Sequence, residues 1–175
     1  MRRLFSNRGM TIIELLSTVA IIGIVSTMAV PRVQKALDKI NSKSGNREMV
    51  SSLKLARSMA ITDKVPYGVN LGTNEPFTFT LFKDEANLAN YTFDDADSVI
   101  RVDTLPIEFS TLTSNLSTQT IIFQPNGSVS IPAGALGTSS QIYIVTLVST
   151  QNLLSIHDNL ILPATGRVKT NSYYY

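Results

Sequence analysis

The longest apolar stretch of the sequence covers residues 10–30, which read MTIIELLSTVAIIGIVSTMAV, and Glu14 is its only charged residue. As an α-helix this stretch would extend about 31 Å at about 1.5 Å per residue, close to the roughly 30 Å hydrocarbon core of a bilayer. A buried helix of a soluble protein would carry a polar stripe, whereas only serine and threonine hydroxyls interrupt this one. The pattern predicts a transmembrane helix over residues 10–31.

An amphipathic pattern continues the helix through residues 32–64. Apolar residues between Val33 and Ile40 recur at intervals of three and four, which is the spacing of one helix face. The polar stretch 41–46, NSKSGN, contains a glycine and predicts a weak or flexible part of the helix. Pro66 is expected to end the helical region.

From residue 65 onward the pattern changes to short alternating runs separated by Gly, Pro and Asn, which is typical of β-strands. Pro125-Asn126-Gly127 predicts a hairpin turn, because proline presets φ and glycine accepts a positive φ. We therefore expect an α+β protein with a β-rich head domain over residues 65–175. The predicted strands are Val65–Leu71, Phe77–Phe82, Ser98–Val102, Ile107–Phe109, Thr120–Gln124, Ser128–Ile131, Gln141–Ser149, Leu153–His157, Leu160–Leu162 and Arg167–Thr170.

Composition narrows the functional classes. The 175 residues are enough for one compact domain beside a membrane segment, but too few for two full domains. No Cys and a single His exclude disulfides, Cys-ligated zinc, thiol nucleophiles and sites with two His ligands. His157 precedes Asp158, but no Gly-x-Ser-x-Gly elbow accompanies them, so we interpret His157 as a strand or turn residue. We predict no catalytic residue, cofactor or metal site.

Glu14 is anomalous, because a carboxylate inside a membrane helix costs about 2.5–3.5 kcal/mol on insertion scales and needs a partner. The nine residues before the apolar stretch, MRRLFSNRG, are basic and end in Gly9. Cleavage just before Met10 would place a new α-amine one helical turn from Glu14, in the same chain or in a neighbour.

The sequence RGMTIIELL around this point resembles the class III signal of type IV prepilins and pseudopilins. A proline that closes the apolar helix, as Pro31 does, also fits that family. The resemblance implies that prepilin peptidase removes leader residues 1–9 by cutting after Gly9, that Met10 is N-methylated, and that Glu14 pairs with the amine of an adjacent subunit. It also implies storage in the bacterial inner membrane, with the head in the periplasm, until the inner-membrane assembly platform builds the filament.

Two other interpretations of the N-terminus stay open. An ordinary secretory signal also joins a basic start to an apolar stretch, and Thr27-Met28-Ala29 would serve as its cleavage site. The product would be a soluble periplasmic binding protein that begins at Val30. A plain signal-anchor helix, in which Glu14 is incidental, is the second alternative.

Further stretches resemble the GspH/FimT branch of the pseudopilins. They are LKLARSMAI at 53–61 with VPYGV at 65–69, and FQPNG at 123–127 with TGRV at 165–168; residues 84–119 match no motif. The branch implies a long helix packed on two antiparallel β-sheets. It includes minor pseudopilins of type II secretion and minor pilins of type IV pili. We therefore interpret the chain as a structural subunit of such a filament, with other pilin or pseudopilin subunits as partners.

Charge is distributed unevenly along the chain. Residues 32–64 hold eight basic and three acidic residues, whereas residues 65–110 hold two basic and eight acidic residues. A basic helix and an acidic head would pair between stacked subunits, but two solvated surfaces explain the same pattern. Among the acids, Asp84, Glu85 and residues 94–97 offer oxygen ligands for Ca²⁺ without EF-hand spacing, so we favour a solvated acidic loop.

Arg167 and Lys169 are the candidate DNA-binding residues. On a strand they would point to one face, and Tyr173–Tyr175 follow them. Cations and aromatic rings contact phosphates and stack on bases. DNA-binding members of the branch carry Gly-Arg-x-Arg here, whereas Lys169 keeps the charge but lacks the bidentate fork. A DNA receptor on a transformation pilus is thus the alternative function, and a solvated strand with a frayed tail is the simpler explanation.

Overall fold

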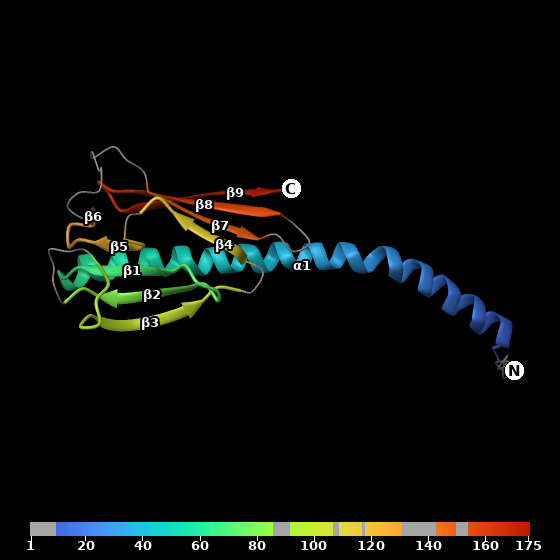
Figure 1. The fold of residues 1–175 in the computed structure, drawn as a ribbon. Helices are drawn as coiled ribbons and strands as arrows, with labels where there is room; N and C mark the ends of the chain where they lie inside the picture. The colour runs from blue at the N-terminus through green and yellow to red at the C-terminus, as the bar shows by residue number, and fades with distance from the viewer. Residues whose placement is uncertain (1–9, 86–91, 107–108, 117, 131–142, 150–153) are drawn as a thin grey trace, which may run out of the picture. The chain divides into compact units, whose positions relative to one another are not determined.

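The structure is a computed structural model that describes residues 10–85, 92–106, 109–116, 118–130, 143–149 and 154–175. Helix α1 (Ile12–Asp63) runs through both helical patterns of the sequence, so the predicted continuation beyond the apolar stretch is confirmed (Figure 1). By packing, the chain divides into two compact units, Met1–Leu37 and Asp38–Tyr175.

Both ends of α1 have a local cause. The Oγ1 atom of Thr11 accepts a hydrogen bond from the backbone N–H of Glu14 at 3.3 Å, so Thr11 is the N-cap of the helix. At the other end, Lys64 adopts a left-handed conformation with φ of 60°, which stops the helix at Asp63. Lys64, and not Pro66 as predicted, therefore ends the helix.

The apolar half of α1 exposes every side chain from Met10 to Leu37. By length and composition, α1 qualifies as a membrane-spanning helix among the described residues. Pro31 lies inside α1, so it closes the apolar stretch while the helix continues past it, as predicted. Proline removes one backbone hydrogen bond, and the bonds of the flanking turns carry the helix past it.

Three hydroxyl groups of this segment are satisfied within the helix itself. Ser17 Oγ donates to the carbonyl oxygen of Glu14 at 2.9 Å, and Thr18 and Thr27 make equivalent bonds at 2.8 Å to the carbonyls three residues earlier. Such bonds matter in lipid, because no water is present there to pair with polar groups. These three hydroxyl-bearing residues are therefore compatible with a membrane span.

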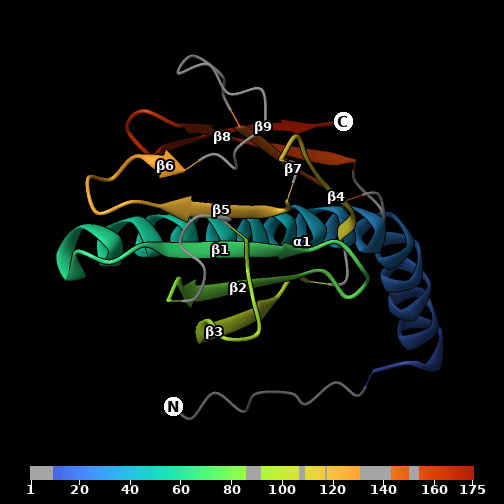
Figure 2. The same ribbon diagram turned by 60° about the vertical axis from the view of Figure 1, so that its left-hand side comes forward.

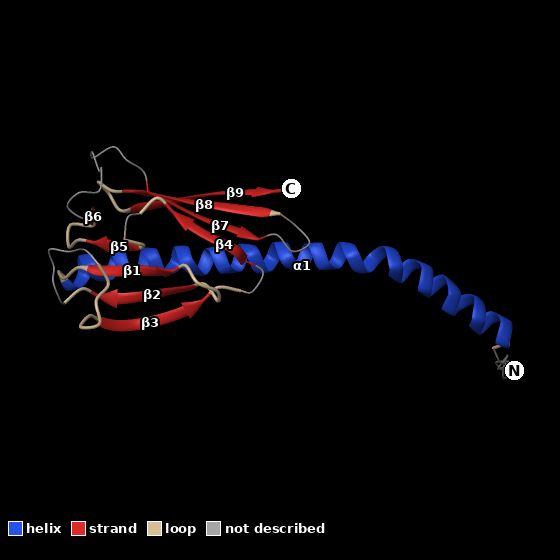
Figure 3. Ribbon diagram, viewed as in Figure 1, coloured by secondary structure: helices blue, strands red, loops and turns tan. Residues whose placement is uncertain are grey.

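The head contains two antiparallel sheets, which confirms the expectation from the family resemblance (Figure 3). The first sheet has the order β3-β2-β1-β5-β6, with β1 (Tyr67–Gly72), β2 (Thr78–Lys83), β3 (Ser98–Thr104), β5 (Thr120–Phe123) and β6 (Val129–Ser130). The second has the order β4-β7-β8-β9, with β4 (Phe109–Ser114), β7 (Tyr143–Ser149), β8 (Ser155–Leu162) and β9 (Arg167–Tyr174).

The turn between β5 and β6 is the hairpin that the sequence predicts. Gly127 has φ of +82°, and its N–H donates to the carbonyl of Gln124 at 2.7 Å. Ile122 and Phe123 pair with Ser130 and Val129 in antiparallel register.

The core of the head lies where the head part of α1 runs along both sheets (Figure 2). Fully buried side chains come from the helix (Met49, Leu53), from the first sheet (Phe79, Phe123) and from the second (Leu147, Ile161). Burial of each such side chain contributes about 1.5–3 kcal/mol. Ala56 and Ala60 are also fully buried, and their small size lets the helix approach the sheets closely.

Several strands differ from the predicted ones. The predicted strand Ile107–Phe109 falls partly outside the described residues, and β4 runs on to Ser114 through mostly polar sequence. The predicted pair Leu153–His157 and Leu160–Leu162 is one strand, β8. That prediction was wrong because Asp158 and Asn159, which usually mark turns, find partners here: Asp158 accepts a bond from Thr146 Oγ1 at 2.8 Å.

Strand β9 is also longer than predicted. It continues past Thr170 to Tyr174, and each of its residues pairs in register with β8, ending at Ser155↔Tyr174. The Lys39 Nζ atom lies 4.3 Å from the centre of the Tyr174 ring, a cation–π contact with α1. The prediction of a frayed aromatic tail is therefore wrong for the residues up to Tyr174.

The polar stretch 41–46 is a regular part of α1 and not the weak segment that was predicted. Ser42, Gly45 and Asn46 are buried. A β-carbon added at Gly45 would lie 2.6 Å from the Phe109 ring and 2.7 Å from the Pro106 ring. The glycine is thus required by close packing between the helix and the start of β4.

Candidate functional site

The N-terminal end of α1 carries the residues predicted for processing and assembly. Met10 is 67% exposed, and Glu14 lies in the first turn of the helix with an exposed side chain. Gly9 lies outside the described residues. Because Glu14 is the single charged residue among residues 10–31, its carboxylate stands on an otherwise apolar surface. The pairing of Glu14 with an α-amine stays a prediction.

A buried chain of hydrogen bonds joins α1 to the second sheet. Ser42 Oγ lies 2.5 Å from Ser155 Oγ and 2.8 Å from His157 Nε2, and His157 Nδ1 lies 2.8 Å from Ser172 Oγ. Burial lowers the pKa of His157, and the neighbouring Asp158 opposes this effect. The ring is therefore neutral near pH 7, so that one nitrogen donates and the other accepts. The interpretation of His157 as a strand residue is confirmed.

A second pair of hydrogen bonds lies one helical turn further along α1. Asn159 Nδ2 donates to Asn46 Oδ1 at 2.7 Å, and Thr170 Oγ1 donates to Asn159 Oδ1 at 2.7 Å. The polar seam, as we call it, comprises Ser42, Asn46, Ser155, His157, Asn159, Thr170 and Ser172. No sequence motif indicates this seam, although the spacing of Ser42 and Asn46 places both on one helix face. Five of these residues, all except Thr170 and Ser172, are buried, and buried polar groups that are paired in this way fix one docking arrangement of helix and sheet.

Arg57 ties α1 to two turns that are far apart in the sequence. Its Nε donates to the carbonyl of Gly127 at 3.2 Å and to the carbonyl of Thr165 at 2.9 Å. Gly166 has φ of +61°, and a β-carbon there would lie 2.2 Å from the Gly127 carbonyl oxygen. The motifs at 53–61, 123–127 and 165–168 therefore meet around one guanidinium group.

The acidic segment before β3 is more buried than the predicted solvated loop. Asp84 is 3% exposed, and its Oδ2 has no hydrogen-bond partner within the described residues. Burial, followed by repulsion from Asp97 and Asp94, raises the pKa of Asp84 to about 6. Asp97 accepts hydrogen bonds from the backbone N–H groups of Glu85 and Asp94, at 3.1 and 2.9 Å. The described part of the chain holds no cluster of three or more acidic, His or Cys side chains placed to bind a metal ion.

Asp84 makes stability depend on pH in a defined direction. Because its pKa is about 6 in the fold and 3.8 ordinarily, ionisation above pH 6 costs folding free energy that is recovered as the pH falls toward 3.8. We expect Asp84→Asn to gain about 1–1.5 kcal/mol relative to wild type between pH 5 and pH 8. Denaturant unfolding followed by tyrosine circular dichroism measures this difference. The lowered pKa of His157 has the opposite effect on the pH dependence of stability, but it is the same in wild type and in Asp84→Asn, so it cancels in their difference. If the two proteins show parallel profiles of stability against pH, the assignment to Asp84 is contradicted.

Strand β9 places both candidate DNA-binding residues at the surface. Arg167 and Lys169 are exposed, whereas Val168 between them is half-buried against the core. Alternation along the strand therefore puts Lys169 on the outer face of the second sheet, whereas Arg167, the first residue of β9, lines a cavity together with Lys54 and Arg57 of α1. DNA binding by this pair stays a prediction.

An exposed apolar helix with one acid in its first turn, joined to a head of two antiparallel sheets, defines the class of type IV pilin-like filament subunits. The model of the family described as type II transport protein GspH matches residues 46–155, and the prokaryotic N-terminal methylation motif matches residues 4–30. The first match covers more than half of the chain, so the chain belongs to the GspH family, a structural pseudopilin family of type II secretion. Searches of curated proteins and of solved structures found no match.

Proposed function

We propose that this pseudopilin is a minor subunit of its filament, processed by prepilin peptidase after Gly9 and N-methylated at Met10. The observation that carries the proposal is the exposed apolar segment from Met10 to Pro31, whose single charge, Glu14, lies in the first helical turn. The methylation motif covers the same segment, which favours this processing over an ordinary secretory signal.

The proposed mechanism is mechanical and follows from the two units. Residues 10–31 anchor the subunit in the inner membrane, residues 32–64 continue the helix, and residues 65–175 form the periplasmic head. When the assembly platform extracts the subunit, its apolar side chains leave lipid and pack among the helices of other pseudopilins. Because lipid is as apolar as those helices, close packing and polar contacts must stabilise the assembled state. Glu14 supplies such a contact with the amine of a neighbour.

The mature N-terminus tests this proposal. On co-expression with a prepilin peptidase, we expect intact-mass and N-terminal sequence analysis to show a chain that begins at N-methylated Met10. A Gly9→Asp variant should keep its leader, because the cleavage site is lost. A mature chain that begins at Val30 would instead identify an ordinary signal peptide and refute the proposed processing.

A further inference from the structure

Strand β9 forms an open edge of the second sheet. It pairs along its full length with β8, and among the described strands it has no neighbour on its other side. An edge strand presents a row of backbone N–H and C=O groups that a further strand can pair with. This edge is therefore able to accept an extended polypeptide segment.

A basic cavity of about 440 Å³ lies between this edge and α1. The helix contributes three cationic side chains to it, and none of its described lining residues carries a carboxylate. Its lining consists of Lys43, Asn46, Arg47, Val50, Ser51, Lys54, Thr170 and Ser172. A second cavity of about 340 Å³ shares Lys54 with the first, and its other lining residues are Arg57, Gly166, Arg167 and Val168.

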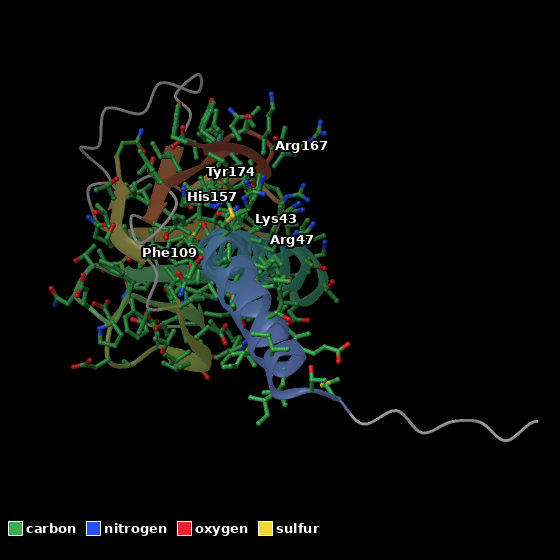
Figure 4. All side chains as sticks on the ribbon, turned by 90° about the vertical axis from the view of Figure 1, so that its right-hand side faces the viewer. Lys43, Arg47, Phe109, His157, Arg167 and Tyr174 are labelled. Atoms are coloured by element: carbon green, nitrogen blue, oxygen red, sulfur yellow. The ribbon has the colours of Figure 1, made fainter. Side chains whose placement is uncertain are left out.

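These cations have no acidic partner within the described part of the chain. None of Lys43, Arg47 and Lys54 is in an ion pair there, and Arg57 donates to neutral carbonyl groups. Spacings of four, seven and three residues place all four on one helix face. Figure 4 shows Lys43, Arg47 and Arg167 on the same flank of the head.

The two faces of β9 are both basic. Thr170 and Ser172 line the cavity beside α1, whereas Lys169 belongs to the opposite set of alternating residues. A strand added beside β9 would direct alternate side chains to the helix cations and to Lys169 on the outer face. Acidic side chains on such a strand would thus meet positive charge on either side.

We propose that the β9 edge, with the basic cavities beside it, binds an extended acidic segment of a partner polypeptide as a fifth strand of the sheet. The segments of this chain outside the described residues hold Glu108 as their single acid, so the ligand must come from another molecule. A phosphodiester chain would use the cations but leave the backbone groups of β9 unpaired, and therefore an acidic peptide fits the edge better. The site is independent of N-terminal processing.

Fluorescence anisotropy with the full chain in neutral detergent tests the proposal. The probe is a labelled ten-residue peptide of alternating Thr and Glu, compared with the same peptide of Thr and Gln and with an N-methylated Thr-Glu peptide. We expect the unmodified Thr-Glu peptide to bind at least about tenfold more tightly than either control peptide. The Thr-Gln peptide lacks charge, and the N-methylated Thr-Glu peptide cannot pair as a strand. The double variant R47E/K54E should bind it about tenfold more weakly, whereas R32E/K35E, a matched change on α1 outside the cavity, should bind like wild type.

Three outcomes would overturn the inference. Equal binding of the N-methylated peptide excludes strand addition, and no preference for Glu over Gln excludes recognition of charge. Tighter binding of single-stranded DNA of equal charge, lost in R47E/K54E, makes the cavity a nucleic-acid site. Thermal unfolding of both double variants confirms that the head is folded, and the mature N-terminus is unaffected by any of these results.

Discussion

Replacement of Glu14 by alanine should reduce incorporation of the subunit into filaments by about a hundredfold, without lowering its amount in the membrane. Glu14 is the single charge of the exposed apolar segment of α1. In a filament its loss would leave the amine of a neighbouring subunit buried without a partner. Removal of one member of a buried ion pair costs about 3–5 kcal/mol, which corresponds to about a hundredfold or more in an equilibrium. Immunoblots of sheared filaments and of membranes measure the two amounts.

Two variants separate the pairing of Glu14 with a neighbouring subunit from a local role of Glu14 in capping its own helix. Thr11 caps the helix, and Glu14 occupies the position three residues later at which Glu or Gln completes a capping box. Glu14→Gln keeps that capping ability but removes the charge, so we expect it to be as defective as Glu14→Ala. Thr11→Ala removes the cap, at a cost of about 1 kcal/mol, and should still assemble. Normal assembly of Glu14→Gln would show that Glu14 only caps its own helix.

Gly45→Leu should destabilise the head by about 3 kcal/mol, which would lower its melting temperature by about 10 °C. A β-carbon at this position already lies 2.6 Å from the Phe109 ring and 2.7 Å from the Pro106 ring, so a larger side chain must push the helix away from β4. That displacement also strains the neighbouring bonds of the polar seam. Tyrosine circular dichroism of the full chain in detergent follows the melting of the head.

Ser44→Leu is the matched control for this prediction. Ser44 is the preceding helix residue and is exposed. Leucine is a better helix former than serine, so this variant should melt within about 2 °C of wild type. If Gly45→Leu melts like Ser44→Leu, the packing of α1 against the start of β4 is not as tight as described.

The sequence was sufficient where one local signal decides the structure. The apolar run from Met10 to Val30 predicts a helix, and the Pro125-Asn126-Gly127 turn is fixed by backbone preferences. Both are present as predicted. Glu14 could be singled out for the same reason, because its charge contradicts its surroundings.

Structure that depends on distant partners could not be predicted from local preferences. Asn159 disfavours a strand by itself, but it bonds Asn46, which lies 113 residues away. Ser42 and Asn46 look like a weak point of the helix until β8 supplies their partners. The edge position of β9 likewise depends on the strand order of the whole sheet, which no stretch of sequence encodes alone.

The polar seam determines where a pulling force on the helix enters the head. Its bonds from Ser42 and Asn46 end on β8, which is held by β7 on one side and by β9 on the other. Traction along α1 would therefore reach an interior strand, and pulling that strand out of the sheet would require the backbone bonds on both of its sides to break. An attachment to an edge strand would instead require the bonds on one side alone to break. We therefore expect the head to resist unfolding when tension is applied along its helix.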